Sequence, residues 1–481
     1  MAAILLALHP FAAAGAEHLV PSQYPSIQDA VDAASPGDTV RIATGDYYEQ
    51  LFIWDKRDLA IVGEPGTVLH ATSGLSQTLL PATATRAVVG LLRSDVSLMG
   101  LTVDGDQIGD MFSSSSGELQ GVFFVGSSGR VQDCIIRNFR GSTLTDYSGA
   151  RGLIIWNPVR AGGPAEINVQ VISNTFEGNE TCVAIAGDDD TNPTLLRTRF
   201  TIEGNSLTGF GGEALAIDGI GIYTGASGEV RGNTFENFNY TGSSTGTLVP
   251  FSSGVAAMDT FARRRNPPQA VQLHPIRFEA NTFRNNDEHL VVLGVRQAEI
   301  VNNVFTGSGP VPRPWGALLV SGLNQIIANN NFADLPTGIF LFGSGDQILD
   351  NWPSVGVPRN TRLTGNWFSN VPQMIRFPSQ QLTGIQIEGT NQPPFRPEFL
   401  PVSIQGDGLQ INVRGWHGES VVLESSSDLR QWIAISTNTA SLPLLELIVP
   451  PDWRAPVPSG LVVGGDRAPA GRGFFRIRKT D

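Results

Sequence analysis

Hydrophobic and polar residues alternate in short runs along most of the chain, and glycine or asparagine closes each run. Runs of this period indicate short β-strands and not helices. One phrase recurs through the middle of the chain, with the form apolar-x-x-Asn-x-aromatic or aliphatic. Its asparagines are Asn174, Asn205, Asn233, Asn281, Asn303, Asn330 and Asn366, and Cys134 takes the same place in an earlier copy. The chain is therefore a repeat of short β units.

The spacing of this phrase predicts a solenoid. Successive asparagines are 31, 28, 48, 22, 27 and 36 residues apart, within the range of repeat architectures. Loops of different length leaving each coil explain this variation, whereas a propeller would have a more even period. We expect each asparagine to occupy a tight bend in an unusual backbone conformation and to bind its counterpart in the next coil. The aromatic residue two positions later is expected to fill the interior.

One helical segment interrupts the β pattern near the N-terminus. Its apolar residues recur on one helical face, at Ile27, Ala30, Val31 and Ala34. Ser26 and Asp29 form a start that resembles a capping box, and a Pro-Gly pair ends the segment. Because the end of a stacked coil must be covered, we expect this helix to cap the first coil. Val40 and Ile42 are expected to point inward from the strand that follows.

The same stretch resembles the first coil of the pectin lyase-like superfamily of right-handed parallel β-helices. The resemblance is carried by Ile27-Gln28-x-Ala30-Val31-Asp32-x-Ala34, Gly37-Asp38-Thr39-Val40 and Thr44-Gly45-Asp46-Tyr47-Tyr48-Glu49, and by the repeat-like segment 221–238. It extends over residues 20–390 and implies the β-helix fold, on which many members bind polysaccharides. The motifs of pectate lyases, polygalacturonases, pectin methylesterases and alginate epimerases are absent, so the resemblance implies no specific activity.

The pattern changes at both ends of the predicted β-helix, which we place at residues 17–390. Residues 391–401 form a proline-rich linker. The alternating segments at 402–481 predict a small antiparallel β-sandwich. At the N-terminus, an apolar stretch followed by small residues predicts a signal peptide over residues 1–16 and hence a secreted, extracellular or periplasmic protein. The alternative for this stretch is a disordered apolar tail.

Composition narrows the classes of partner. The 481 residues carry a formal net charge of -13, which excludes a general attraction to nucleic acids or to anionic membranes. No later stretch has the roughly 18 consecutive apolar residues of a membrane span. The hydrophobic content of 41% is enough for a large core, and we expect a monomer. Cys134 and Cys182 are expected to be small buried hydrophobes, with a disulfide between them as the alternative.

The main acidic candidates are the run Asp188, Asp189 and Asp190, together with Asp218. Asp189 and Asp218 follow similar apolar segments and are 29 residues apart, close to the 31-residue interval between the first two repeat asparagines. We therefore expect Asp218 to stack beside the run. Asp189 and Asp218 could then divide the acid and base roles of glycoside hydrolysis. All four carboxylates could instead bind Ca²⁺, or the run could be a solvated turn.

A second set of candidates surrounds the long insertion between Asn233 and Asn281. Arg263 belongs to an arginine triplet that could neutralise the carboxylate of an acidic sugar. In a lyase, His274 or Tyr223 could then remove the proton next to that carboxylate. The alternatives are a solvated basic loop and a structural histidine.

These patterns leave three hypotheses of function. The first is a secreted lyase or hydrolase acting on an acidic polysaccharide, because equivalent residues of successive coils line up about 4.8 Å apart along a groove. The second is a non-catalytic extracellular protein that binds a glycan or another partner, and the third is a spacer stabilised by Ca²⁺. Convergence of Asp189, Asp218 and Arg263 in one groove favours the first.

Overall fold

The computed structural model describes most of the predicted β-helix and the strands of the C-terminal part. The described ranges are 15–77, 85–112, 117–143, 148–158, 162–187, 196–210, 218–239, 252–258, 274–308, 317–341, 358–377, 384–388 and the strands β36 to β42. The chain divides into two compact units. The first comprises Met1–Arg362 and Phe368–Ile385, and the second comprises Leu363–Trp367 and Gln386–Asp481.

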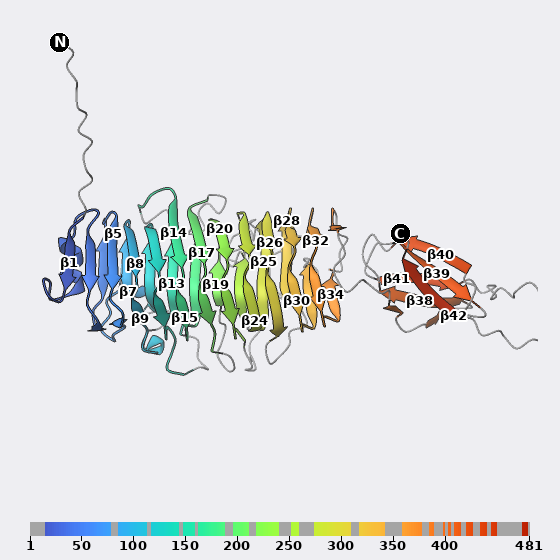
Figure 1. Ribbon diagram of the computed structural model, residues 1–481, viewed down its shortest axis with the longest axis horizontal. Helices are drawn as coiled ribbons and strands as arrows, with labels where there is room; N and C mark the ends of the chain where they lie inside the picture. The colour runs from blue at the N-terminus through green and yellow to red at the C-terminus, as the bar shows by residue number, and fades with distance from the viewer. Residues whose placement is uncertain are drawn as a thin grey trace, which may run out of the picture. The chain divides into compact units, whose positions relative to one another are not determined.

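The first unit is a right-handed parallel β-helix, as predicted (Figure 1). Each coil contributes strands to three parallel sheets, in which strands of successive coils lie side by side. Sheet A contains β1 (Glu17–Val20), β2 (Thr39–Ile42), β5 (Leu59–Gly63), β8 (Asp95–Met99), β11 (Ser128–Gln132), β14 (Ile167–Ile172), β17 (Thr198–Glu203), β20 (Ala226–Arg231), β23 (Ile276–Glu279), β26 (Ala298–Val301), β29 (Ile326–Ala328), β32 (Arg362–Thr364) and β35 (Gln386–Glu388).

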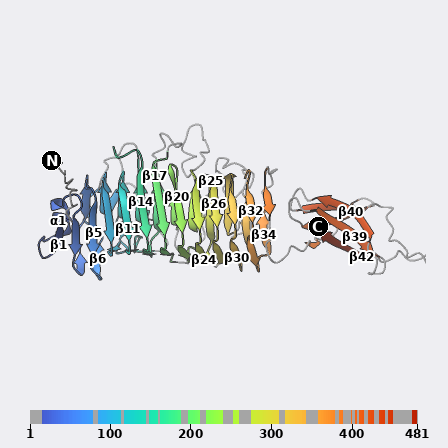
Figure 2. The same cartoon turned by 45° about the horizontal axis from the view of Figure 1, so that its top comes forward.

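Sheets B and C complete each coil (Figure 2). Sheet B contains β3 (Gly45–Tyr47), β6 (Thr67–His70), β9 (Thr102–Asp104), β12 (Ile135–Arg137), β15 (Thr175–Glu177), β18 (Ser206–Thr208), β21 (Thr234–Glu236), β24 (Thr282–Asn286), β27 (Val304–Ser308), β30 (Asn331–Ala333) and β33 (Trp367–Ser369). Sheet C contains β4 (Leu51–Trp54), β7 (Thr85–Leu92), β10 (Glu118–Val125), β13 (Arg151–Trp156), β16 (Thr181–Ala186), β19 (Asp218–Ile222), β22 (Ser253–Met258), β25 (Glu288–Arg296), β28 (Leu318–Leu323), β31 (Thr337–Leu341) and β34 (Gln373–Arg376).

The repeated asparagines form a buried ladder at the corner between sheets A and B, as predicted. The backbone N–H of Asn205 donates to Oδ1 of Asn233 at 2.9 Å, and Asn233 donates in turn to Oδ1 of Asn281 at 3.0 Å. Cys134 occupies the same place and donates its N–H to Asn174 Oδ1 at 2.9 Å. Each side chain therefore pairs a backbone group of the neighbouring coil that burial would otherwise leave unsatisfied.

The expected backbone conformation of the asparagines was wrong by one position. The left-handed conformation belongs to the residue before the ladder position, as at Ser173 (φ 56°), Gly204 (φ 64°) and Ala280 (φ 54°). That residue turns the chain, and the asparagine after it can then direct its side chain along the stack. One residue therefore makes the bend, and the asparagine that follows it forms the ladder.

Phenylalanines two residues after the ladder stack in the interior, as predicted. The ring centroids of Phe235 and Phe283 are 4.8 Å apart, and the stack continues through Phe305, Phe332 and Phe368 at 4.7 to 4.9 Å. These distances match the spacing of neighbouring strands. The interior is therefore filled by like residues placed one above another.

The predicted capping helix is present as α1 (Ile27–Ala33). The hydroxyl of Ser26 accepts a hydrogen bond from the N–H of Asp29, and the apolar face predicted above is buried. Val40 and Ile42 are fully buried, also as expected. The strand β1, which pairs with β2 ahead of the helix, was not predicted.

Two polar residues of the first-coil motif, Gln28 and Glu49, attach this helix to the coil. The carboxylate of Glu49 accepts hydrogen bonds from the N–H groups of Ile27 and Gln28 at 3.0 and 3.1 Å. Because these N–H groups have no partner inside the helix, Glu49 satisfies them. The amide of Gln28 bonds to both backbone groups of Phe52, the N–H at 2.8 Å and the carbonyl at 3.0 Å. Gln28 and Glu49 of the first-coil motif therefore hold the capping helix α1 against the first coil.

The second unit contains two small antiparallel sheets. One has β36 (Glu398–Phe399), β37 (Ser403–Gln405), β38 (Gly408–Arg414) and β41 (Leu444–Val449), and the other has β39 (Ser420–Ser426), β40 (Ile433–Thr439) and β42 (Phe474–Lys479). The strand β36 pairs with β38 although it falls within the expected linker. Most of the predicted signal peptide lies outside the described residues. Among those described, neither α1 nor the short 3-10 helix η1 (Gly109–Met111) has the length and hydrophobicity needed to cross a bilayer.

Both cysteines are buried free thiols, in line with their interpretation as small hydrophobes. Burial raises the pKa of Cys134 to about 11 and that of Cys182 to about 12. Thiols with such pKa values are not reactive nucleophiles at neutral pH. Neither residue is therefore a candidate for chemistry.

Candidate active site

A change in side-chain direction near the start of the sheet C strands creates the candidate site. The pairing of β10 with β13 passes from Gln120–Arg151 directly to Val122–Leu153. Gly121, between them, faces the interior, because a Cβ there would lie 2.8 Å from the ring of buried Phe139. Since Val122 is also an interior residue, Gln120 must face outward.

The neighbouring coil confirms this direction. Ala87, the register partner of Gln120, packs in an apolar cluster on the outer face of sheet C. One residue per coil follows in the same register, and we call this set the polar row. It consists of Gln120, Arg151, Thr181, Asp218, Ser253 and Glu288, from β10, β13, β16, β19, β22 and β25. Its members are spaced at about 4.8 Å per coil.

An apolar and aromatic surface adjoins the polar row on the same outer face. Phe123 and Trp156 lie parallel with ring centroids 6.3 Å apart, and Ile154 packs against the same cluster. Trp54, in the same register column as Trp156, is 55% exposed. Aromatic faces beside polar groups suit sugar rings, whose C–H faces are apolar and whose edges carry hydroxyls.

Asp218 and Tyr223, both predicted site residues, lie on this face of sheet C. Tyr223 follows the end of β19, and its ring lies across Gly221, where a Cβ would approach the phenol oxygen to 2.5 Å. Gly221 stands between Asp218 and Tyr223 in the chain. The absence of a side chain at Gly221 therefore lets the phenol extend back toward the polar row.

Asp218 is the titratable group with the best-defined environment in the polar row. Burial raises its pKa to about 6, against a hydrogen bond from Ser253 and the positive charge of Arg151, which lower it. The Ser253 Oγ donates to Asp218 Oδ1 at 2.6 Å. A carboxyl group with this pKa is protonated in mildly acidic solution and can act as a general acid.

Arg151 is held in the polar row from two sides. It forms an ion pair with Glu118, and the side chain stays 24% exposed. The segment before it is fixed by Glu180, whose carboxylate accepts from Ser148 Oγ at 2.7 Å and from the Gly149 N–H at 2.8 Å. Burial raises the pKa of Glu180 although these hydrogen bonds lower it. A positioned, partly exposed guanidinium of this kind can bind a carboxylate ligand.

The lengths of the connections between strands also favour sheet C as the location of the site. Two residues join sheet A to sheet B in the middle coils, as between β14 and β15, β17 and β18, or β20 and β21. The long connections attach at the edges of sheet C instead, such as those between β18 and β19, β21 and β22, and β22 and β23. Binding sites in repeat proteins favour the face that carries variable loops.

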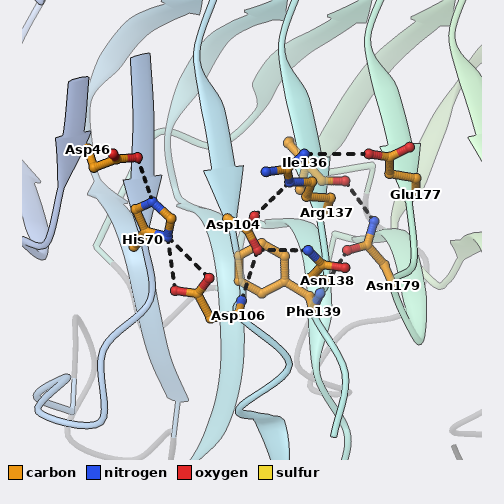
Figure 3. A network of polar contacts seen from close by, with 10 residues as sticks. All are labelled: Asp46, His70, Asp104, Asp106, Ile136, Arg137, Asn138, Phe139, Glu177 and Asn179. Carbon is orange, nitrogen blue, oxygen red and sulfur yellow. Dashed lines mark hydrogen bonds and ion pairs between the residues drawn. The ribbon is translucent and has the colours of Figure 1, made fainter. Parts of the chain in front are cut away.

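Sheet B carries charges that neutralise one another on its outer face (Figure 3). His70 lies between Asp46 at 3.1 Å and Asp106 at 3.0 Å, and Asp104 bonds to Arg137 at 2.6 Å. Ligand atoms of His70, Asp104 and Asp106 are close enough together to hold a metal ion. Each is already engaged by a charged or polar partner, so we interpret the group as a charge ladder that joins coils.

The structure changes the expected arrangement of the acidic candidates. Asp218 pairs in register with Thr181, so the offset between coils is 37 residues here and not the expected 29. Thr181 begins β16, so the 29-residue register from which the stacking of Asp218 beside the acidic run was predicted is wrong, while the stacking itself stays a prediction. The loop before β19 is longer than the asparagine spacing suggested. Asp188, Asp189 and Asp190 themselves lie outside the described residues.

The basic candidates are only partly described. Arg263 lies outside the described residues. His274 precedes β23, and the carbonyl of the next residue, Pro275, accepts from Ser227 Oγ at 2.6 Å. Since β23 pairs with β20, His274 lies one coil beyond the corner that contains Tyr223, at the edge between sheets C and A.

Sequence reasoning missed Gln120, Arg151 and Glu288, although a signal for them exists. A triplet made of a polar residue, a small or buried residue and an aliphatic residue lies at or near the start of each of these strands. The copies are Gln120-Gly121-Val122, Arg151-Gly152-Leu153, Thr181-Cys182-Val183, Asp218-Gly219-Ile220, Ser253-Gly254-Val255 and Glu288-His289-Leu290. Aligning these triplets would have given the register of sheet C directly.

Comparisons with known proteins assign no family to this chain. No protein-family model matches the sequence, and no curated protein is similar to it. A Family 28 exopolygalacturonase of Yersinia enterocolitica is 11% identical, with a TM-score of 0.39 over 78% of this chain and 79% of that one. The PL6 family alginate lyase AlyGC is 14% identical, with a TM-score of 0.35 over 82% of this chain and 54% of that one.

A third solved structure of this kind is the DFA-IIIase of Arthrobacter chlorophenolicus A6 in complex with DFA-III. It is 12% identical, with a TM-score of 0.35 over 73% of this chain and 93% of that one. These likenesses are distant, and the fold assignment rests on the sheets, the ladder and the cap described above. The molecule is a right-handed parallel β-helix protein.

Proposed function

We propose that this chain is a secreted carbohydrate-active enzyme that binds an acidic polysaccharide along the outer face of sheet C and hydrolyses it. The observation that carries the proposal is the environment of Asp218, a carboxyl group with a pKa of about 6 in a row of polar side chains. Glu288 stands in the same row two coils further on. Two coil spacings amount to about 10 Å between Cα atoms.

This separation suits two carboxyl groups that flank a glycosidic bond with a water molecule between sugar and base. Inverting glycosidases place their carboxyl groups about 6.5–9.5 Å apart for this reason. Asp218 would donate its proton to the leaving oxygen, and Glu288 would activate the water. Arg151, two coils before Asp218, would bind the carboxylate of a neighbouring acidic sugar.

A second candidate reaction is elimination, favoured by the position of Tyr223. Its phenol lies across Gly221 toward the polar row, where it could remove the proton next to a uronate carboxylate. Arg263 or Arg151 would neutralise that carboxylate, and His274 would be the alternative base. Ca²⁺ bound by Asp188, Asp189, Asp190 and Asp218 would then serve the same neutralising purpose.

The deciding experiment measures two products in parallel on a panel of acidic and neutral polysaccharides. New reducing ends without ultraviolet absorbance support hydrolysis, whereas absorbance from unsaturated ends supports elimination. Each reaction is run with Ca²⁺ and with a chelator. Asp218→Asn should abolish hydrolysis, and Asp95→Asn, at an exposed site on sheet A, should not. Product from neither assay across the panel contradicts both enzyme proposals and favours a binding or structural role.

Secretion is proposed from the N-terminal sequence and is compatible with the first strand. β1 begins at Glu17, so removal of residues 1–16 would leave its pairing with β2 intact. Mass spectrometry of the exported protein should give a first residue of Glu17. A mature chain that retains the apolar stretch contradicts the signal-peptide prediction.

A further inference from the structure

The side-chain amide of Gln120 is buried without a hydrogen-bond partner. The residue is fully buried, yet neither Oε1 nor Nε2 of its side chain has a hydrogen-bond partner. A buried amide without partners lowers the stability of the fold, and such groups in native proteins call for an explanation. Asn157, also fully buried, differs because its amide nitrogen donates to two carbonyls.

The neighbours of Gln120 define what could satisfy it. Ala87 precedes it in the polar register, Arg151 follows it, and Phe123 lies further along the same strand on the same face. The carboxamide therefore stands between an apolar patch and a guanidinium. It offers two donors and one acceptor oxygen. Sugar hydroxyls, which both donate and accept, match the amide, the apolar face of the ring matches Phe123, and a uronate carboxylate matches Arg151.

We propose that Gln120 forms a distal sugar-binding subsite that selects acidic oligosaccharides of several units. The proposal rests on the proposed function and deepens it. Three register steps separate Gln120 from Asp218, or about 14 Å. One sugar ring cannot span this distance, so contact at Gln120 requires a chain that extends from the reaction centre. The side chain of Arg151, the register neighbour of Gln120 in the next coil, is 24% exposed.

Gln120 is thus a specificity-determining residue and not a catalytic one. The test compares Gln120→Leu, which keeps the volume and removes the polar atoms, with the unaltered full chain. The probes are oligogalacturonates and oligoalginates of two to eight units, with binding measured by calorimetry and KM and kcat measured wherever cleavage occurs. Gln170→Leu, on the outer face of sheet A, is the matched control.

For the longest probes we expect Gln120→Leu to lose affinity about tenfold or more, with kcat unchanged. Two-unit probes should bind as before. The thermal unfolding midpoint should stay constant or rise, because an unsatisfied amide has been removed. Gln120→Glu, which adds a negative charge beside Arg151 and Glu118, should weaken binding of acidic probes more than that of neutral ones.

The outcomes separate the subsite from the function on which it rests. If the unaltered chain binds long acidic probes and folded Gln120→Leu binds them equally well, the subsite proposal is overturned and the amide holds a trapped water molecule. An equal loss for short and long probes also overturns it, because the residue then acts at the reaction centre. If the unaltered chain binds none of the probes, the proposed function fails and the subsite fails with it.

Discussion

Ser253 donates its hydroxyl hydrogen to Asp218 Oδ1 at 2.6 Å, from the coil that follows. Burial raises the pKa of this carboxyl to about 6, while the bond from Ser253 lowers it. The two residues therefore set the acid strength of the candidate site together. A hydrogen bond to the charged form of a carboxyl favours that form.

Removing this bond should shift the pH dependence of the reaction. In Ser253→Ala the pKa of Asp218 should rise above 6, so the alkaline limb of kcat/KM should move to higher pH. Ser253→Thr keeps the hydroxyl and should leave the limb in place. The profile is measured from pH 4 to 9 on the polysaccharide that the panel identifies. An unchanged limb in Ser253→Ala would show that Asp218 is not the essential acid.

Asp218 should also make stability fall as pH rises. Its folded pKa of about 6 lies above the ordinary aspartate pKa of 3.8, so the folded state binds more protons than the unfolded state between these values. The contribution to the unfolding free energy is complete below pH 4 and is lost as pH rises through 6, by up to about 3 kcal/mol. Asp218→Asn should flatten this part of the curve. Denaturant unfolding at pH 4 to 8 tests the slope, and equal slopes in both proteins would contradict the assignment.

The asparagine ladder should respond strongly to a single deletion. Asn233→Ala removes the acceptor for the Asn205 N–H and the donor to the Ile202 carbonyl, both buried. Two unsatisfied backbone groups should cost about 3 kcal/mol of unfolding free energy. Asn331→Ala, at an exposed position of sheet B, should change it by less than about 0.5 kcal/mol. Similar losses in the two variants would mean that the ladder contributes nothing beyond ordinary packing.

The first coils should loosen at alkaline pH. Burial lowers the pKa of His70, but hydrogen bonds to Asp46 and Asp106 outweigh it and the net pKa is raised. The stabilisation is therefore complete below the unfolded pKa of about 6.5 and is lost as pH rises through the folded value. Hydrogen exchange in β3, β6 and β9, corrected for intrinsic rates, should accelerate over that interval. His70→Gln should exchange faster throughout and without the pH dependence. Exchange in the unaltered protein that does not change with pH would contradict a stabilising role of the His70 charge.

The fold could be predicted from the sequence because each motif that indicates it lies within a short stretch of the chain. The Asn-x-Phe phrase marks a two-residue corner, and the segment from Ile27 to Ala34 carries its own cap and apolar face. The only error in the corner was one of position, since the left-handed conformation falls on the residue before the asparagine. That shift follows from the direction of the side chain, which composition alone does not give.

The candidate site was predicted less well because it depends on register between distant residues. Asp218 and Tyr223 were identified and do lie on one face, but Asp218 was paired with the wrong part of the preceding coil. The asparagine interval measures sheets A and B, and a loop of different length intervenes before sheet C. Only the triplets that begin the sheet C strands report that register, and they place Arg151 and Gln120 in the same row as Asp218.

The two-residue corner between sheets A and B has a consequence for how such a chain can change over evolution. Intervals between ladder asparagines vary from 22 to 48 residues, yet the hydrogen bonds between them stay between 2.8 and 3.0 Å. Insertions at the edges of sheet C therefore leave the asparagine ladder at the corner between sheets A and B unchanged. New loops can be acquired, exchanged or lost at those edges one coil at a time, while the core that carries them is inherited unchanged.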